Sequence, residues 1–321
     1  MKTLFFTGKG GVGKSTLAAA AAWQLSQKSR VLIVSLDPAH NLGDIFGLAM
    51  HGRQKRFSES LVLREVNLQQ LSEDYLRQET EVLCSSYSYL KTLNLDHYFS
   101  TLKYTPGIEE YALLTSISRT LREDAGYDYI IFDTPPTGLT LRFLALPQVS
   151  ITWIDRLMSI RRQILEKRHT IHRIKGTMSS RETVLNYSED EDDILKRLRL
   201  LNDRYQALSR YLRGEDCHLV LVFNPDTLSL KESDRLIEGL RDLDIPLRLL
   251  IDNKVSPANP DMAGQVEGAI TAKAGDVPLT RIHQAETLQK DGLYLIPEPI
   301  VPEAWQRGFE PSSDITGKGH G

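Results

Sequence analysis

The chain has 321 residues, enough for one large α/β domain with insertions, and a formal net charge of only −3. Its basic residues are dispersed, which argues against a nucleic-acid-binding face. Its two cysteines, Cys84 and Cys217, are too far apart in sequence for a disulfide framework or a C-x₂-C zinc site. No apolar run approaches the roughly 20 residues that cross a bilayer, so we expect a cytoplasmic protein that is not an integral membrane protein.

Short apolar runs that lack period-two alternation are typical of parallel strands buried on both faces. Helical patterns lie between runs of this kind, which indicates βαβ units. We therefore expect an α/β fold with a mostly parallel central sheet flanked by helices, and a ligand at the carboxyl ends of its strands. The predicted strands span residues 3–7, 31–36, 129–132, 219–223, 247–251 and 293–296.

A phosphate-binding loop follows the first predicted strand. Residues 8–15, GKGGVGKS, fit the P-loop pattern G-x-x-x-x-G-K-[ST] between a strand and an alanine-rich helix. Glycines let the backbone curl around a polyphosphate, and the helix that begins near Lys14 adds its positive end. Lys14 is expected to reach the outer phosphates, and the Ser15 hydroxyl is a candidate Mg²⁺ ligand. The predicted nucleotide-binding residues are Gly8, Lys9, Gly10, Gly11, Val12, Gly13, Lys14, Ser15 and Thr16, of which Thr16 fits a helix start better than a ligand.

Polar motifs follow the second and third predicted strands. The sequence DPAHNLGD brings Asp37 and Asp44 to the end of the second strand, and DTPPTG brings Asp133 to the end of the third. Taken alone, each motif also fits a turn or a helix cap. Because phosphoryl transfer needs metal ligands and a positioned water besides a phosphate loop, these carboxylates are candidates for both roles.

Two segments, about 50–125 and 148–215, are too long for simple crossovers. We expect them to be helical insertions that form a subdomain within a single domain spanning residues 1–321. The second segment holds two apolar stripes at helical spacing, which fit either helix packing or an interaction surface. Between them, residues 188–193 (SEDEDD) are expected to form a solvated loop. The stripes comprise Trp153, Leu157, Ile160 and Ile164, and then Ile194, Leu198, Leu201, Tyr205, Leu208 and Leu212.

Several motifs resemble one family of ATPases. The loop sequence KGGVGKS, with Lys9 inside it, is similar to the deviant Walker A motif of a class of dimeric ATPases that includes the ParA, MinD and ArsA families. DPAHNLGDIFG (37–47) and DTPPTGLTLRFLALP (133–147) resemble switch I and switch II of the ArsA family, which includes the ATPase that guides tail-anchored membrane proteins. The resemblance runs from residue 3 to about 300, is vague in both insertions, and continues in PGIEEYALL (106–114), NPDTLSLKESDRL (224–236) and DNKVSP (252–257).

The resemblance implies that the chain binds ATP and Mg²⁺ and hydrolyses ATP. Lys14 and Ser15 would contact the phosphates and the metal, with Asp37 and Asp133 on the metal side. Asp44 would orient and polarise the attacking water, a role that suits a carboxylate.

A homodimer is also implied, because Lys9 in this class crosses to the partner subunit's phosphates. Lys9, Lys14 and Asp44 are therefore the candidate catalytic residues. Asn253 matches the family's adenine-reading asparagine, although an asparagine after a strand is equally typical of a turn. The role of His40 is left open.

The sequence departs from the family at several points. Leu139 stands where switch II usually has histidine, and Pro135 where alanine is usual, which puts coupling through that loop in question. The paired zinc cysteines of the eukaryotic targeting factors and the cysteine cluster of arsenite-binding ArsA are both missing. Arsenite activation is accordingly disfavoured.

The favoured function is an ATP-hydrolysing homodimeric switch whose helical insertions bind an unidentified protein or membrane client. A MinD- or ParA-type positioning ATPase is the first alternative, but it would carry a basic face or a terminal basic amphipathic helix. The tail PSSDITGKGHG shows neither. The two remaining alternatives are an ATPase associated with an arsenite pump and a small-molecule kinase.

Overall fold

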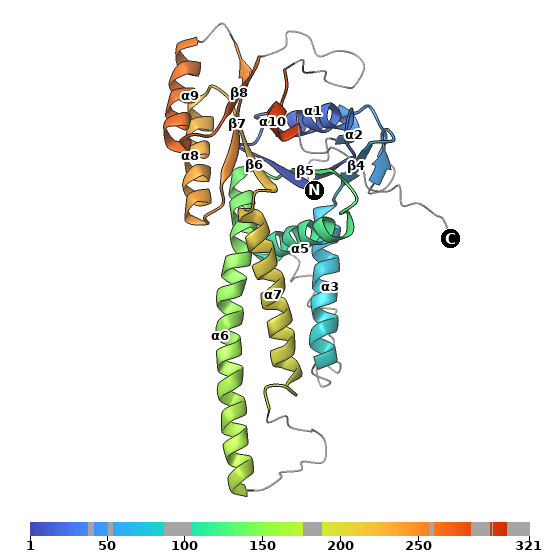
Figure 1. Ribbon diagram of the computed structural model, residues 1–321, viewed down its shortest axis with the longest axis vertical. Coiled ribbons are helices and arrows are strands. Elements are labelled where there is room, and N and C mark those ends of the chain that lie inside the picture. The colour runs from blue at the N-terminus through green and yellow to red at the C-terminus, as the bar shows by residue number, and fades with distance from the viewer. Residues whose placement is uncertain are drawn as a thin grey trace, which may run out of the picture.

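The computed structural model describes residues 1–37, 42–50, 54–86, 105–175, 188–256, 260–283, 296 and 298–306. Its centre is an eight-stranded sheet with the strand order β3-β4-β2-β5-β1-β6-β7-β8. All neighbouring strands run parallel except β3 and β4, which pair antiparallel. The predicted α/β fold of P-loop NTPase type, with a mostly parallel sheet flanked by helices, is confirmed (Figure 1).

Five of the predicted strands are present in the structure. Each contains a buried apolar run, as is typical of a strand between two helical layers. Of the predicted sixth strand, residues 293–295 lie outside the described residues. The five are β1 (Lys2–Thr7), β2 (Val31–Ser35), β5 (Tyr129–Asp133), β6 (Cys217–Phe223) and β7 (Leu247–Val255).

Three further strands were not predicted from the sequence. They are β3 (Gln54–Arg56), β4 (Leu61–Glu65) and β8 (Leu279–His283). β3 and β8 lie at the sheet edges and are mostly polar, and β4 has only three apolar residues before Arg64 and Glu65, so none of them stands out as a buried run. β3 and β4 also lie inside the segment 50–125, which therefore contributes two strands to the sheet as well as helices.

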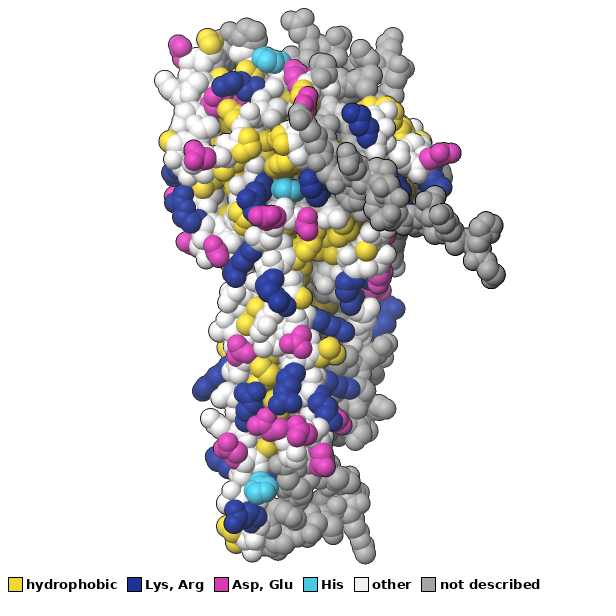
Figure 2. All heavy atoms as spheres, viewed as in Figure 1, with side chains coloured by type: hydrophobic (Ala, Val, Ile, Leu, Met, Phe, Trp, Pro, Cys, Tyr) yellow, Lys and Arg dark blue, Asp and Glu magenta, His cyan; other side chains and the backbone are white. Residues whose placement is uncertain are grey.

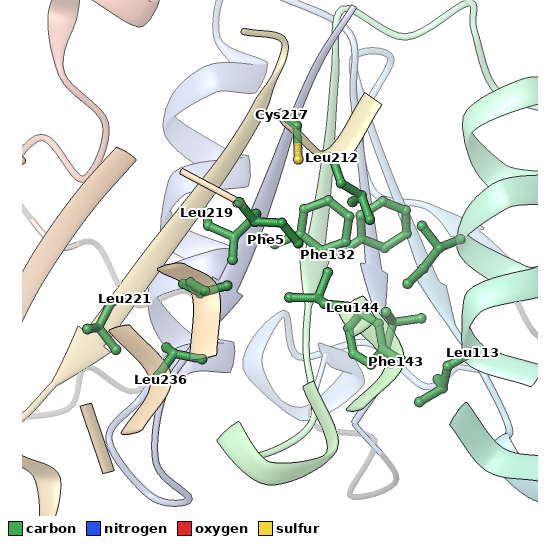
Figure 3. Close-up of a cluster of buried hydrophobic side chains, with 14 of the residues drawn as sticks. Phe5, Leu113, Phe132, Phe143, Leu144, Leu212, Cys217, Leu219, Leu221 and Leu236 are labelled. Carbon is green, nitrogen blue, oxygen red and sulfur yellow. The ribbon is translucent and has the colours of Figure 1, made fainter. Parts of the chain in front are cut away.

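Alternate residues of the strands face two separate hydrophobic layers. On β1, Leu4 and Phe6 pack against the alanine-rich helix α1 (Lys14–Ser26), whereas Phe5 points to the opposite side. There Phe5 stacks on Phe132 of β5, with ring centroids 4.8 Å apart (Figure 3). This second layer is completed by side chains of α5 (Ile108–Glu123), α6 (Thr137–Lys175), α7 (Asp193–Arg213), α8 (Thr227–Asp242) and α9 (Pro260–Ala274).

Figure 1 shows α6 and α7 extending together away from the sheet, with α3 (Leu68–Ser86) running in the same direction. We call α6 and α7 the helical extension. They share a small core of their own, built from Ile154, Met158 and Leu165 of α6 and Leu195 of α7. Within the described parts of the chain, no helix combines the length and the hydropathy that crossing a bilayer requires. The short helices α2 (Leu42–Ile45) and α10 (Glu303–Gln306) lie near the sheet.

Residues 188–193 were expected to form a solvated loop, and for Asp192 this expectation is wrong. Its carboxylate is 1% exposed, accepts a hydrogen bond from the Leu195 backbone N–H as the N-cap of α7, and forms a two-point ion pair with Arg161 of α6. The Arg161 hydrogen bond is the main cause that lowers the pKa of Asp192. The acidic run therefore fastens the two helices of the extension together.

Candidate functional site at the carboxyl edge of the sheet

The glycine loop joins the end of β1 to the start of α1. Gly8, Gly11 and Gly13 have φ angles of 147°, 83° and 94°, a region that favours glycine. A Cβ atom on Gly8 would lie 2.1 Å from the carbonyl oxygen of Val222 on β6, so the loop starts in direct contact with a neighbouring strand. Residues 8–13 form the predicted loop, and Lys14, Ser15 and Thr16 make the first turn of α1.

Residues of β7 hold the loop from the other side. The side-chain amide Nδ2 of Asn253 donates to the carbonyl oxygen of Val12 at 2.7 Å, and Nζ of Lys254 donates to that of Gly11 at 3.0 Å. A Cβ on Gly13 would lie 2.5 Å from Nδ2 of Asn253. Asn253 therefore supports the loop directly, a contact that its proposed adenine-reading role did not predict.

Two buried opposite charges lie behind the loop. The Lys14 ammonium is nearly buried and donates to the carbonyl oxygen of Lys9 at 3.2 Å. Burial lowers the pKa of Lys14, and the charges of Asp133 and Asp37 oppose that shift. Burial also raises the pKa of Asp133 to about 6, against a hydrogen bond from Ser15 and the charge of Lys14. An anion beside Lys14 and a cation beside Asp133 would each stabilise the charged form.

Unpartnered polar atoms gather at the same edge of the sheet. Among the described residues, six side chains near the carboxyl ends of the strands have buried oxygens without a hydrogen-bond partner. Buried polar atoms are normally satisfied, so a row of such atoms indicates a place for a ligand or water. The atoms are Thr7 Oγ1, Ser35 Oγ, Asp133 Oδ1, Thr137 Oγ1, Asn224 Oδ1 and both carboxylate oxygens of Asp252.

The donor set fits a magnesium ion. Oδ1 of Asp133 is unpartnered among the described residues, and the Ser15 hydroxyl lies by the same carboxylate. Mg²⁺ takes hard oxygen ligands, often from only one or two protein groups, with water and phosphate completing the shell. Sequence reasoning named these two residues but missed Thr7, Ser35 and Thr137, whose only signal was their place at a strand or helix end.

The other predicted site residues lie around this edge. Asp37 lies two residues after the end of β2 and is half-buried, and Asp44 lies exposed in α2. Nζ of Lys9 lies 3.8 Å from Oδ1 of Asp226, the N-cap residue of α8. His40 lies outside the described residues.

The start of α6 is tied to the site by hydroxyl groups. Thr134 Oγ1 donates to the carbonyl oxygen of Phe6 at 2.8 Å, and Thr140 Oγ1 donates to that of Pro135 at 2.8 Å. Arg142 of α6 also forms a 3.0 Å ion pair with Glu110, a buried residue in the first turn of α5. The first turns of α6 are thus fixed to β1 and to α5.

The far part of α6 carries an unusual surface. The first apolar stripe was open to two interpretations, helix packing or an interaction surface. In the structure all four of its members are exposed: Trp153 (by 65%), Leu157, Ile160 and Ile164. Packing against α7 uses the neighbouring face instead, through Ile154, Met158 and Leu165. We call the exposed row the outer stripe of α6; its members are Val149, Trp153, Leu157, Ile160, Ile164, Ile171 and Ile174.

Comparison with known proteins identifies the family. A family model described as "Anion-transporting ATPase" matches residues 1–273. The chain belongs to this family, also called ArsA ATPases. A protein of Aquifex aeolicus named "Putative arsenical pump-driving ATPase 2" is 31% identical over 264 residues, which cover 81% of this chain and 82% of that protein. Family membership confirms the predicted ArsA resemblance.

Two eukaryotic relatives have other names. "ATPase GET3A" of Arabidopsis thaliana is 32% identical over 271 residues, which cover 83% of this chain and 70% of that protein. "ATPase ASNA1 homolog" of Dictyostelium discoideum is 28% identical over 268 residues, covering 79% of this chain and 72% of that protein. ATPase is common to all these names, and it supports the predicted nucleotide-binding ATPase.

Proposed function

We propose that this family member is a magnesium-dependent ATPase that works as a homodimeric switch. The observation that carries the proposal is the buried pair Lys14 and Asp133 among unpartnered oxygens at the carboxyl edge of the sheet. An ammonium and a helix N-terminus favour a polyphosphate, and the adjacent carboxylate and hydroxyl oxygens favour Mg²⁺. Membership of an ATPase family supports ATP as the nucleotide.

Different residues at the site would bind the phosphates, the metal ion and the adenine. Backbone N–H groups of residues 8–13 would surround the phosphates, and the Lys14 ammonium would contact the outer ones. Ser15 would hold Mg²⁺ directly, and Asp133 and Asp37 would hold it through water; when bound, the ion neutralises charge on the phosphate oxygens. Asn253 is retained as a proposed adenine contact through its carbonyl oxygen, since its amide nitrogen already supports Val12.

Two further residues would act on the reaction. Asp44, whose carboxylate is exposed at the edge of the site, would orient the attacking water and accept its proton. Lys9 would stabilise charge on the phosphates of the partner subunit, as arginine fingers do in other P-loop enzymes. To do so, Lys9 must leave Asp226, and because this ion pair is partly exposed, little free energy opposes the move.

The helix α6 provides a physical link between the nucleotide and a client. It begins at Thr137, four residues after Asp133, and its 39 residues continue to Lys175, with Pro147 inside the helix. A helix of this length spans roughly 58 Å. Reordering the segment around Thr134 and Thr140 on ATP binding would shift the first turn of α6, and the outer stripe at the far end would move with it.

The substitution Asp44→Asn tests this proposal. It should keep ATP binding but lower turnover by roughly 10²- to 10⁴-fold, because the amide cannot accept the proton of water. ATP affinity by calorimetry and phosphate release should be measured on the same preparation. Undiminished turnover would remove Asp44 from the mechanism, and loss of ATP binding would show that it has a structural role instead.

The name of the Aquifex relative suggests an arsenite-responsive ATPase as a second candidate. Soft thiolates are the expected ligands for such an ion, and this chain has only two cysteines. Arsenite added to the purified protein should therefore leave ATP turnover unchanged; a clear stimulation would favour this candidate.

A further inference from the structure

The outer stripe of α6 is an apolar surface of seven side chains on one helix. Successive members are three, four or seven residues apart, so they form a single line along the helix. Single exposed apolar residues are ordinary, but a continuous line of them is a mark of an interaction site. Trp153, near the start of the line, is amphipathic in the manner of side chains found at membrane interfaces.

The charges beside the stripe all have one sign. At about 100° per residue, Arg156 and Lys167 lie within roughly 60° of the line through Trp153 and Ile171. The only acidic residues of α6, Asp155 and Glu166, lie roughly 140° to 160° away from that line. Both flanking cations are exposed, and neither forms an ion pair with another described residue. Figure 2 shows basic, acidic and hydrophobic side chains interspersed along the extension.

We propose that the outer stripe of α6 docks on the surface of a bilayer that contains anionic lipids. This inference rests on the proposed role of the helical extension in binding a partner, and it names the partner's chemistry. An apolar line flanked by cations is the pattern of a helix that lies in the plane of a membrane, with its apolar side chains among the acyl chains and its cations on the headgroups.

A flat anionic surface suits this stripe better than an apolar transmembrane helix does. A line on one helix can contact a plane along its whole length, whereas a bound transmembrane helix would leave most of its own circumference in water. An uncharged helix would also leave Arg156 and Lys167 without a counter-charge, while anionic headgroups provide one.

Vesicle co-sedimentation of the full chain tests the proposal. The wild-type protein should bind vesicles of mixed phosphatidylcholine and phosphatidylglycerol about tenfold or more tightly than phosphatidylcholine alone, and salt should weaken the binding. Leu157→Glu combined with Ile164→Glu, and separately Arg156→Glu combined with Lys167→Glu, should each reduce binding about tenfold or more. The matched control is Leu228→Glu, at a similarly exposed leucine of α8, which should leave vesicle binding unchanged.

Three results would overturn the inference: no binding to the anionic vesicles, binding equally weakened by Leu228→Glu, or binding only to a detergent-solubilised polyleucine helix through Leu157 and Ile164. Circular dichroism of each variant excludes misfolding as the cause of a loss. ATP hydrolysis by the wild-type protein without vesicles is measured separately. Absent hydrolysis would count against the proposed function, and absent vesicle binding with normal hydrolysis would count against the lipid inference alone.

Discussion

The carboxyl edge of the sheet and the helical extension are stabilised in different ways. At the edge, side chains donate hydrogen bonds to particular backbone carbonyl oxygens, as Asn253 does to Val12 and Thr134 does to Phe6. In the extension, a strip of apolar contacts and one buried ion pair hold α6 to α7. In each region some side-chain groups lack a complementary contact among the described residues. At the edge these are buried polar oxygens without hydrogen-bond partners, and in the extension they are apolar side chains exposed to water.

That difference indicates what each region binds. Buried oxygens without partners are costly unless an ion, a phosphate or water meets them, whereas exposed apolar groups favour another apolar surface. The edge therefore suits a small charged ligand and the extension a large partner. The comparison can be tested by changes that damage one region and spare the other.

The largest expected effect concerns a lysine at the edge. Lys9→Ala should lower ATP turnover by roughly 10³-fold, because a cation that stabilises the phosphates across the dimer is lost. Thermal stability should be almost unchanged, since the ion pair between the Lys9 side chain and Asp226 is partly exposed. Phosphate release is the measurement, with Lys28→Ala as the exposed-lysine control. A strictly monomeric preparation that hydrolyses ATP at the full rate would contradict the cross-subunit role.

Two glycines of the same loop offer a sharper comparison. Gly8→Ala should destabilise the fold by about 3 kcal/mol or more, because its φ angle is unfavourable for alanine and the new methyl would clash with the Val222 carbonyl. Gly10→Ala is the control, since among the described residues other than its two chain neighbours no atom lies within 4 Å of the added Cβ. Urea denaturation of both variants gives the difference. Equal stability would show that the loop lies differently against β6.

A change in the extension should leave the edge intact. Asp192→Ala should cost about 2 to 3 kcal/mol, because the α7 cap and the two-point ion pair with the mostly buried Arg161 side chain are both lost. Asp193→Ala, at an exposed neighbour, is the control. Urea unfolding and ATP affinity should be followed together. If Asp192→Ala weakens ATP binding as much as it weakens the fold, the two regions are not separable.

The smallest effect is a pH dependence from Asp252. Burial, with a contribution from Glu267, raises the pKa of this carboxyl group to about 7 from an ordinary value of 3.8. The folded state therefore holds the proton more tightly, and stability falls as pH rises from about 4 through 7. Asp252→Asn should be more stable than wild type by about 1 to 2 kcal/mol at pH 8.5, with a smaller gain at pH 5. Denaturant midpoints at both pH values measure this, and an equal gain at both would exclude titration as its cause.

The sequence predicted the central strands and the glycine loop because both follow strong local rules. A strand buried on both faces is mostly apolar, and the loop needs glycine at Gly8 and Gly13, where the backbone turns and neighbours approach closely. The edge strands β3 and β8 were missed because an edge strand does not need an apolar sequence.

Contacts between side chains that are distant in the chain could not be predicted from the sequence, for a different reason. The contact of Lys9 with Asp226, the burial of Asp192 by Arg161 and the support of Val12 by Asn253 each join segments far apart in the chain. Helical spacing likewise placed Trp153, Leu157 and Ile160 on one face. It could not decide whether that face meets α7 or water, because the adjacent face, with Ile154 and Met158, is also apolar.

Calorimetric titration of the Asp44→Asn protein with ATP, with and without Mg²⁺, tests the central claim most directly. The account predicts saturable, magnesium-dependent binding of one ATP per chain, and the loss of that binding when Lys14→Ala is added. An absence of binding heat, or equal binding after Lys14→Ala, would contradict a nucleotide site at the carboxyl edge of the sheet.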